Sequence, residues 1–173
     1  MTILPIVIAP DPRLKIKAEP VEAVNDDVRQ LMDDMLETMY DAPGIGLAAP
    51  QVGETCRVIV VDTSHDEEKA ERSPLFMANP ELTWVSDEDY KHEEGCLSLP
   101  EHYADVVRPE AIRVSYLDRD NQPQELEANG ILATCIQHEM DHLDGILFVD
   151  HVSSLKRNMI LRKLTKAKKL AQQ

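Results

Sequence analysis

Two histidines and two acids fall within five consecutive residues, His138-Glu139-Met140-Asp141-His142, in a pattern suited to metal chemistry. Histidines four residues apart on a helix project from one face and can hold a single ion. Glu139 lies beside the first histidine, where it can move a proton between a bound water and a leaving group. A single buried histidine is more often a core residue, but three polar groups on one apolar face favour a shared metal site, since unpaired they would be costly to bury.

The third ligand must come from elsewhere, because a catalytic site of this kind uses three protein ligands and keeps a fourth position open. His151 is available downstream, but its surroundings match no protease signature. Cys96 is the better candidate, since a thiolate prefers soft or borderline metals. Cys56 and Cys135 lie among apolar residues and fit the small core residue that an isolated cysteine usually is.

Hydrophobic spacing predicts three helices. Around the histidines, apolar residues recur with a helical period from about Ile131 to Leu143, and Gly145 ends this helix. An earlier helix is capped by Asn25, carries one apolar stripe and ends near Asp41 to Gly44. A last helix is expected from about Ser153 to Leu170.

Extended segments fill the middle of the chain. The β-branched run Arg57 to Val61 predicts a buried strand, and Cys96 falls in a probable extended segment. Further strands are expected at Leu75–Ala78, Thr83–Val85, Ile112–Leu117 and around Leu126, with a surface loop at His65–Ser73 and a turn at Asp118–Pro123. The pattern predicts an α+β fold: short, mostly antiparallel strands around a central metal-binding helix, with an N-terminal helix and a C-terminal helix.

Composition and charge limit the class of protein. With 173 residues, 43% hydrophobic and 29% charged, the chain suits one globular domain. We expect a catalytic domain at 1–150 and an appended basic helix at 151–173. Against a net charge of -14, residues after Asp150 include seven Lys and Arg and no acid, so this helix could meet nucleic acid or present a solvated face. Three cysteines, no signal peptide and no membrane-spanning run favour a cytoplasmic protein.

Three motifs, in order along the chain, resemble the signature motifs of peptide deformylases. They are Gly44-Ile45-Gly46-Leu47-Ala48-Ala49-Pro50-Gln51, Glu94-Gly95-Cys96-Leu97-Ser98 and Gln137-His138-Glu139-Met140-Asp141-His142. The resemblance extends from the segment Ile6–Val21 to the final helix and so covers nearly the whole chain. It implies hydrolysis of the N-formyl group from the methionine of new polypeptides, with release of formate.

The resemblance also implies a role for each site residue. One divalent ion would be held by Cys96, His138 and His142, with water or hydroxide as fourth ligand. Glu139 would be the general acid and base, while the side-chain amide of Gln51 and the backbone N–H of Leu97 would stabilise the oxyanion.

For the substrate, the resemblance implies strand addition beside the segments around Ile45 and Gly95. The methionine side chain would enter a pocket of four side chains: Ile45, Ile131, Cys135 and the stem of Glu94. Gly46 would let the substrate approach closely, although it also fits a simple turn glycine.

Two positions depart from the family pattern. The dipeptide His102-Tyr103 stands where well-known relatives carry an arginine, so contacts at the far end of the substrate are open. His92 stands where an aliphatic residue is common, and this could alter the depth or polarity of the pocket.

The family implies Fe²⁺ as the native metal, although Cys and His ligands also suit Zn²⁺, Ni²⁺ and Co²⁺. It also implies that the basic final helix docks on the ribosome, and we expect a monomer. Two alternatives remain open from the histidine motif alone. One is a metallopeptidase of the His-Glu-x-x-His type, and the other is a non-catalytic binding domain stabilised by a metal.

Overall fold

The first long helix of the computed structural model, α1 (Asp26–Asp41), begins where Asn25 caps it. The side chain of Asn25 accepts a hydrogen bond of 3.0 Å from the backbone N–H of Val28, which satisfies one of the free amides of the first turn. Within the apolar stripe, Met32, Met35 and Met39 are fully buried, so the stripe faces the core. The structure describes residues 2–64 and 71–171.

A five-stranded antiparallel sheet forms one side of the molecule, in the order β1-β2-β3-β6-β7. Its strands are β1 (Gly46–Ala48), β2 (Val58–Val61), β3 (Leu75–Val85), β6 (Ala111–Leu117) and β7 (Pro123–Asn129). All four residues of β2 are buried, because alternate side chains enter different clusters. Val58 and Val60 pack in the cluster with α1, whereas Ile59 and Val61 pack in the cluster that includes Ile136.

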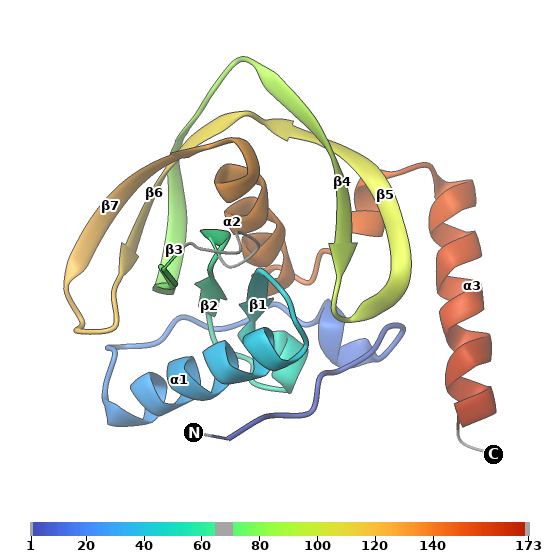
Figure 1. Ribbon diagram of the computed structural model, residues 1–173, viewed down its shortest axis with the longest axis horizontal. Helices are drawn as coiled ribbons and strands as arrows, with labels where there is room; N and C mark the ends of the chain where they lie inside the picture. The colour runs from blue at the N-terminus through green and yellow to red at the C-terminus, as the bar shows by residue number, and fades with distance from the viewer. Residues whose placement is uncertain (1, 65–70, 172–173) are drawn as a thin grey trace.

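The other side is a two-stranded ribbon of β4 (Asp89–Cys96) and β5 (Leu99–Pro109). One face of the ribbon turns inward, since Glu94 of β4 and Ala104 and Val106 of β5 are buried. The opposite face carries exposed residues such as Glu93 and Tyr103. The ribbon lies across from the sheet, with α2 (Gly130–Leu143) between them (Figure 1).

Helix α2 contacts both the five-stranded sheet and the β4–β5 ribbon. It packs against β1 and β2 of the sheet and also contacts β4 and β5 of the ribbon. It ends at Leu143, and two residues later Gly145 has a φ of +74° that suits glycine, while a Cβ there would lie 2.5 Å from the carbonyl oxygen of Lys15. The short helices η1 (Pro12–Lys15), η2 (Ala49–Val52) and η4 (Phe148–His151) complete this region.

The last helix, α3 (Ser154–Ala171), runs beside the ribbon (Figure 1). Its buried residues Ile160 and Leu164 enter a cluster with Leu14 and Phe148. The remaining faces carry most of the basic residues and are exposed. The helix is therefore attached through a narrow apolar stripe.

The α+β class and the three helices are confirmed. The segments predicted at Leu75–Ala78 and Thr83–Val85 are parts of one strand, β3, and both β3 and β5 span 11 residues, longer than the short strands expected. In the expected loop His65–Ser73, residues 65–70 lie outside the described residues and 71–73 are exposed coil. Among the described residues, no helix has both the length and the apolarity to cross a membrane.

Candidate active site

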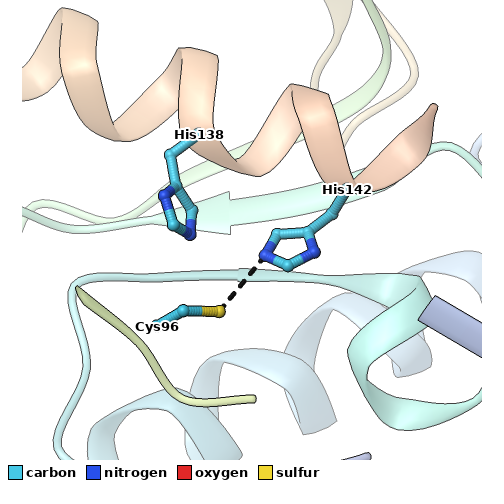
Figure 2. Close-up of side chains that lie close together, drawn as sticks. All are labelled: Cys96, His138 and His142. Carbon is cyan, nitrogen blue, oxygen red and sulfur yellow. Dashed lines mark hydrogen bonds between the residues drawn. The ribbon is translucent and has the colours of Figure 1, made fainter. Parts of the chain in front are cut away.

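Side chains from two distant parts of the chain converge between α2 and the end of β4 (Figure 2). His138 and His142 come from successive turns of α2, and Cys96 comes from the end of β4. The Sγ atom of Cys96 lies 3.4 Å from Nε2 of His142. One sulfur or nitrogen atom from each of the three residues lies within 4.8 Å of the others, close enough to share one ion.

The residues present fit a metal ion. A thiolate and two imidazoles suit soft and borderline metals. Burial lowers the pKa of His142 well below its usual value, and His138 beside it lowers that pKa further. The ring of His142 therefore stays neutral, as a ligand must be.

A carboxylate fixes the orientation of His138. Oε1 of Glu94 lies 2.9 Å from Nδ1 of His138, so the proton belongs on Nδ1 and leaves the lone pair of Nε2 for an ion. Although burial raises the pKa of Glu94, hydrogen bonds from His138 and Arg108 lower it to about 2. Glu94 is therefore ionised at neutral pH.

Arg108 links this carboxylate to a second one. Its guanidinium donates two hydrogen bonds to Glu94 and one of 2.8 Å to Oδ2 of Asp141. The same oxygen of Asp141 lies 2.8 Å from Nε2 of His151. Thus His151, considered in the sequence as a ligand, lies on the far side of Asp141 and outside the cluster of Cys96, His138 and His142.

Glu139 lies beside the three donor atoms and is buried. Its Oε1 has no hydrogen-bond partner among the described residues. Burial raises its pKa to about 7, even though the nearby His138 lowers it. Near neutral pH the carboxyl can therefore both accept and release a proton, which acid–base catalysis requires.

Gln51 reaches the site from η2. Its Oε1 accepts from the backbone N–H of Ala48 at 2.9 Å, while its Nε2 donates to Oγ of Ser98 at 3.1 Å and approaches Sγ of Cys96 at 3.4 Å. These contacts fix which end of the amide faces the sulfur. Leu97 follows Cys96 in the tight turn between β4 and β5, so its backbone lies next to the same donor atoms.

A cavity of about 680 Å³ opens above these residues. It is bounded by the motif at 44–46, the ribbon and α2, and almost every candidate site residue lines it: Gln51, Ile45, Gly46, Glu94, Gly95, Cys96, Leu97, Ile131, Cys135, His138 and Glu139. His142, 1% exposed, lies beneath the cavity. His92, His102 and Tyr103, where the sequence departs from the family pattern, also line it.

Sequence reasoning missed Arg108. It is 5% exposed and holds the two carboxylates together, yet an isolated arginine among other polar residues carries no motif. The available signal is alternation: Ala104, Val106 and Arg108 occupy every second position of β5, which places the arginine on the inward face.

Comparisons with known proteins agree with this geometry. The family model described as polypeptide deformylase matches residues 3–158. A peptide deformylase of Methylocella silvestris is 56% identical over 171 residues, which cover 98% of this chain and 87% of that protein. One of Rhizobium meliloti is 54% identical, with coverage of 98% and 96%.

Solved structures of peptide deformylases are similar to this structure over nearly the whole chain. The peptide deformylase of Ehrlichia chaffeensis in complex with actinonin superposes with a TM-score of 0.91 and 41% identity, covering 96% of this chain and 98% of that one. The enzyme of Legionella pneumophila gives a TM-score of 0.89 and 44% identity, with 99% of each chain covered. The likeness thus includes the ribbon, the sheet and all three helices.

Proposed function

Because the chain belongs to the polypeptide deformylase family, we propose that it removes the formyl group from the N-terminal methionine of new polypeptides and releases formate. The observation that carries this proposal is the position of Glu139. Its unpartnered buried oxygen lies beside the donor atoms of Cys96, His138 and His142, at the base of a cavity that can admit a peptide end.

We propose that Cys96, His138 and His142 hold one divalent ion, natively Fe²⁺, which Zn²⁺, Ni²⁺ or Co²⁺ can replace. When bound, such an ion lowers the pKa of a water molecule and polarises a carbonyl oxygen. Glu94 and Arg108 assist metal binding without contacting the ion. Glu94 holds His138 in the tautomer that presents Nε2, and Arg108 holds Glu94 in place.

The catalytic steps assigned to this chain are proton transfer and orientation. Glu139 takes a proton from the attacking water and delivers it to the departing amine nitrogen, so its carboxylate is regenerated in each turnover. The side-chain amide of Gln51 and the backbone N–H of Leu97 donate hydrogen bonds to the formyl oxygen as it gains charge. The hydrogen bond that Gln51 accepts from Ala48 and the one that it donates to Ser98 fix the amide in advance.

The substrate would bind as an added strand. Within the described structure, β1 is an edge of the sheet and β4 belongs to a two-stranded ribbon, so each presents an edge to the cavity between them. We propose that the peptide backbone lies beside Gly46 and Gly95. Its methionine side chain would enter the part of the cavity lined by Ile45, Ile131, Cys135 and the stem of Glu94.

Formate release from formyl-Met-Ala-Ser, measured with iron-loaded enzyme under anaerobic conditions, tests this function. Internally quenched peptides with a free N-terminus serve as the comparison, because a metallopeptidase would cleave their internal bonds. We expect formate from the first substrate and intact peptides in the second assay. Internal cleavage would favour the metallopeptidase, and metal binding with neither activity would favour a non-catalytic binding domain.

We further propose that residues 1–150 form the catalytic domain of a cytoplasmic monomer and that α3 docks on ribosomal RNA. The support is charge, since Arg162, Lys163 and Lys166 are exposed on α3. Removing α3 would expose the cluster that Ile160 and Leu164 fill, so charge reversal is the cleaner test.

The triple variant Arg162→Glu/Lys163→Glu/Lys166→Glu should lose co-sedimentation with ribosomes while hydrolysing small formyl-peptides at the parent rate. A control for charge reversal outside α3 is Lys17→Glu, which changes one exposed lysine. Unchanged co-sedimentation of the triple variant would refute this part of the proposal.

A further inference from the structure

The mouth of the cavity has an aromatic ring surrounded by carboxylates. Tyr103 of β5 is 60% exposed and lies across the ribbon from Gly95. A Cβ added to Gly95 would lie 2.6 Å from Cε1 of Tyr103, so the ring lies directly over that glycine. The ring is held in place by the strand pair, yet one side of it remains open.

Three acids lie near this ring. Asp105 is two residues after Tyr103 on β5, and its strand partner Glu93 is two residues before Gly95 on β4, so both side chains share the outer face of the ribbon with Tyr103. Glu101 has a φ of +68° beside a register shift, which interrupts the alternation, and it is placed near the ring by the cavity that both residues line. Tyr103, Glu93 and Glu101 also line the cavity.

Two of these carboxylates are not neutralised by the protein. Asp105 has Lys91 3.8 Å away, whereas Glu93 and Glu101 have no ion-pair partner in the described part of the chain. Of the described residues that line the cavity, none is a lysine or an arginine. The mouth therefore has a negative potential and an aromatic face, a combination that attracts a cationic side chain.

We infer that the ring of Tyr103 and the carboxylates of Glu93 and Glu101 select peptides with lysine or arginine immediately after the formylmethionine. This inference rests on the proposed function and on binding as an added strand. Successive side chains of a strand point to opposite faces. When the methionine points inward to Ile131 and Cys135, the second side chain points outward, to the face that carries Tyr103.

The test compares three substrates that differ only at the second residue: formyl-Met-Lys-Ser, formyl-Met-norleucine-Ser and formyl-Met-Glu-Ser. For the parent, we expect kcat/KM to be about tenfold higher with Lys than with Glu at low salt, from one cation–π contact and two exposed ion pairs. The norleucine peptide should fall between them. The preference should shrink in 0.5 M NaCl, because exposed charges are screened.

Two double variants separate the local effect from the overall acidity of the protein. Glu93→Gln/Glu101→Gln should reduce the ratio of kcat/KM between the Lys and Glu peptides to about twofold. The single variant Tyr103→Ala should slow hydrolysis of the Lys peptide more than that of the norleucine peptide. Asp87→Asn/Glu88→Gln removes the same charge from exposed positions at the β3–β4 turn and should leave the ratio near tenfold.

The outcomes are distinguishable. Equal rates with Lys and Glu in the parent, or equal losses in the two double variants, would overturn the inference and leave the proposed function standing. Absence of formate from all three peptides would overturn the proposed function and this inference with it.

Discussion

Arg108 grips the carboxylate of Glu94 with two hydrogen bonds, 2.7 Å from Nε to Oε2 and 3.0 Å from Nη2 to Oε1. Both side chains are almost completely buried. A buried ion pair of this kind gives little net stability by itself, but the loss of one partner leaves an uncompensated charge. Because Glu94 also binds His138, the fold and the proposed metal site depend on the same pair.

The variant Arg108→Met should therefore be strongly destabilised. We expect a loss of about 3 to 5 kcal/mol in the free energy of unfolding, measured in urea with the zinc-loaded protein. The affinity for Zn²⁺, measured by competition with a chelator, should also fall, because Glu94 loses the two hydrogen bonds that hold it against His138. Arg113→Met is the control, since Arg113 pairs with Glu125 and Glu127 on the exposed face of the sheet. Equal stability of the two variants would contradict this reading.

The sequence predicted the helices better than the ribbon, for a physical reason. In α1 and α2 the apolar residues repeat at helical spacing and the ends have caps or a glycine, so the signal is local. In β4 and β5 the inward positions include Glu94 and Arg108, two charged residues that would be predicted to be exposed to solvent. They are buried because they pair with each other across the ribbon, and pairing between strands is not visible along one strand.

Gly46 has no space for a larger side chain. A Cβ at this position would lie 2.4 Å from Oε2 of Glu139 and 2.8 Å from Sγ of Cys135, so Gly46→Ala must displace the carboxylate. We expect kcat/KM for formyl-Met-Ala-Ser to fall by about 10²-fold, because small displacements of a catalytic group have effects of this size. The unfolding temperature and the zinc content should change little. A fully active variant would show that Glu139 can move without loss.

Asp62 should give the protein a pH-dependent part of its stability. Burial raises its pKa, but hydrogen bonds from Ser64, Tyr40 and the N–H of Ser73 outweigh this and lower it below the usual 3.8. A carboxylate with a lowered pKa stabilises the folded state fully above its unfolded pKa, and the contribution disappears as the pH falls through the folded pKa.

The variant Asp62→Asn keeps the shape of Asp62 but presents an NH₂ group to these donors. At pH 7 we expect it to be less stable than the parent by about 1 to 3 kcal/mol in urea unfolding. The difference should be constant down to about pH 5 and then shrink as the pH falls below 4, as far as the parent remains folded. A difference that does not vary with pH over this range would exclude the ionised form of Asp62 as the source.

Glu139→Gln separates chemistry from metal binding. Glutamine has nearly the same shape, but it cannot carry a proton from the attacking water to the amine, so the rate should fall by about 10²- to 10⁴-fold. Zinc content should stay at the parent level, because the sulfur and nitrogen donors of Cys96, His138 and His142 are unchanged. The free enzyme should also lose the pH dependence of kcat/KM that Glu139 causes. The comparison variant is Cys96→Ala, which should lose both metal and activity, since it removes a donor atom. If Glu139→Gln were as active as the parent, a different group would have to transfer the proton. Among the described residues, Glu139 alone has a buried carboxylate oxygen without a hydrogen-bond partner at the base of this cavity.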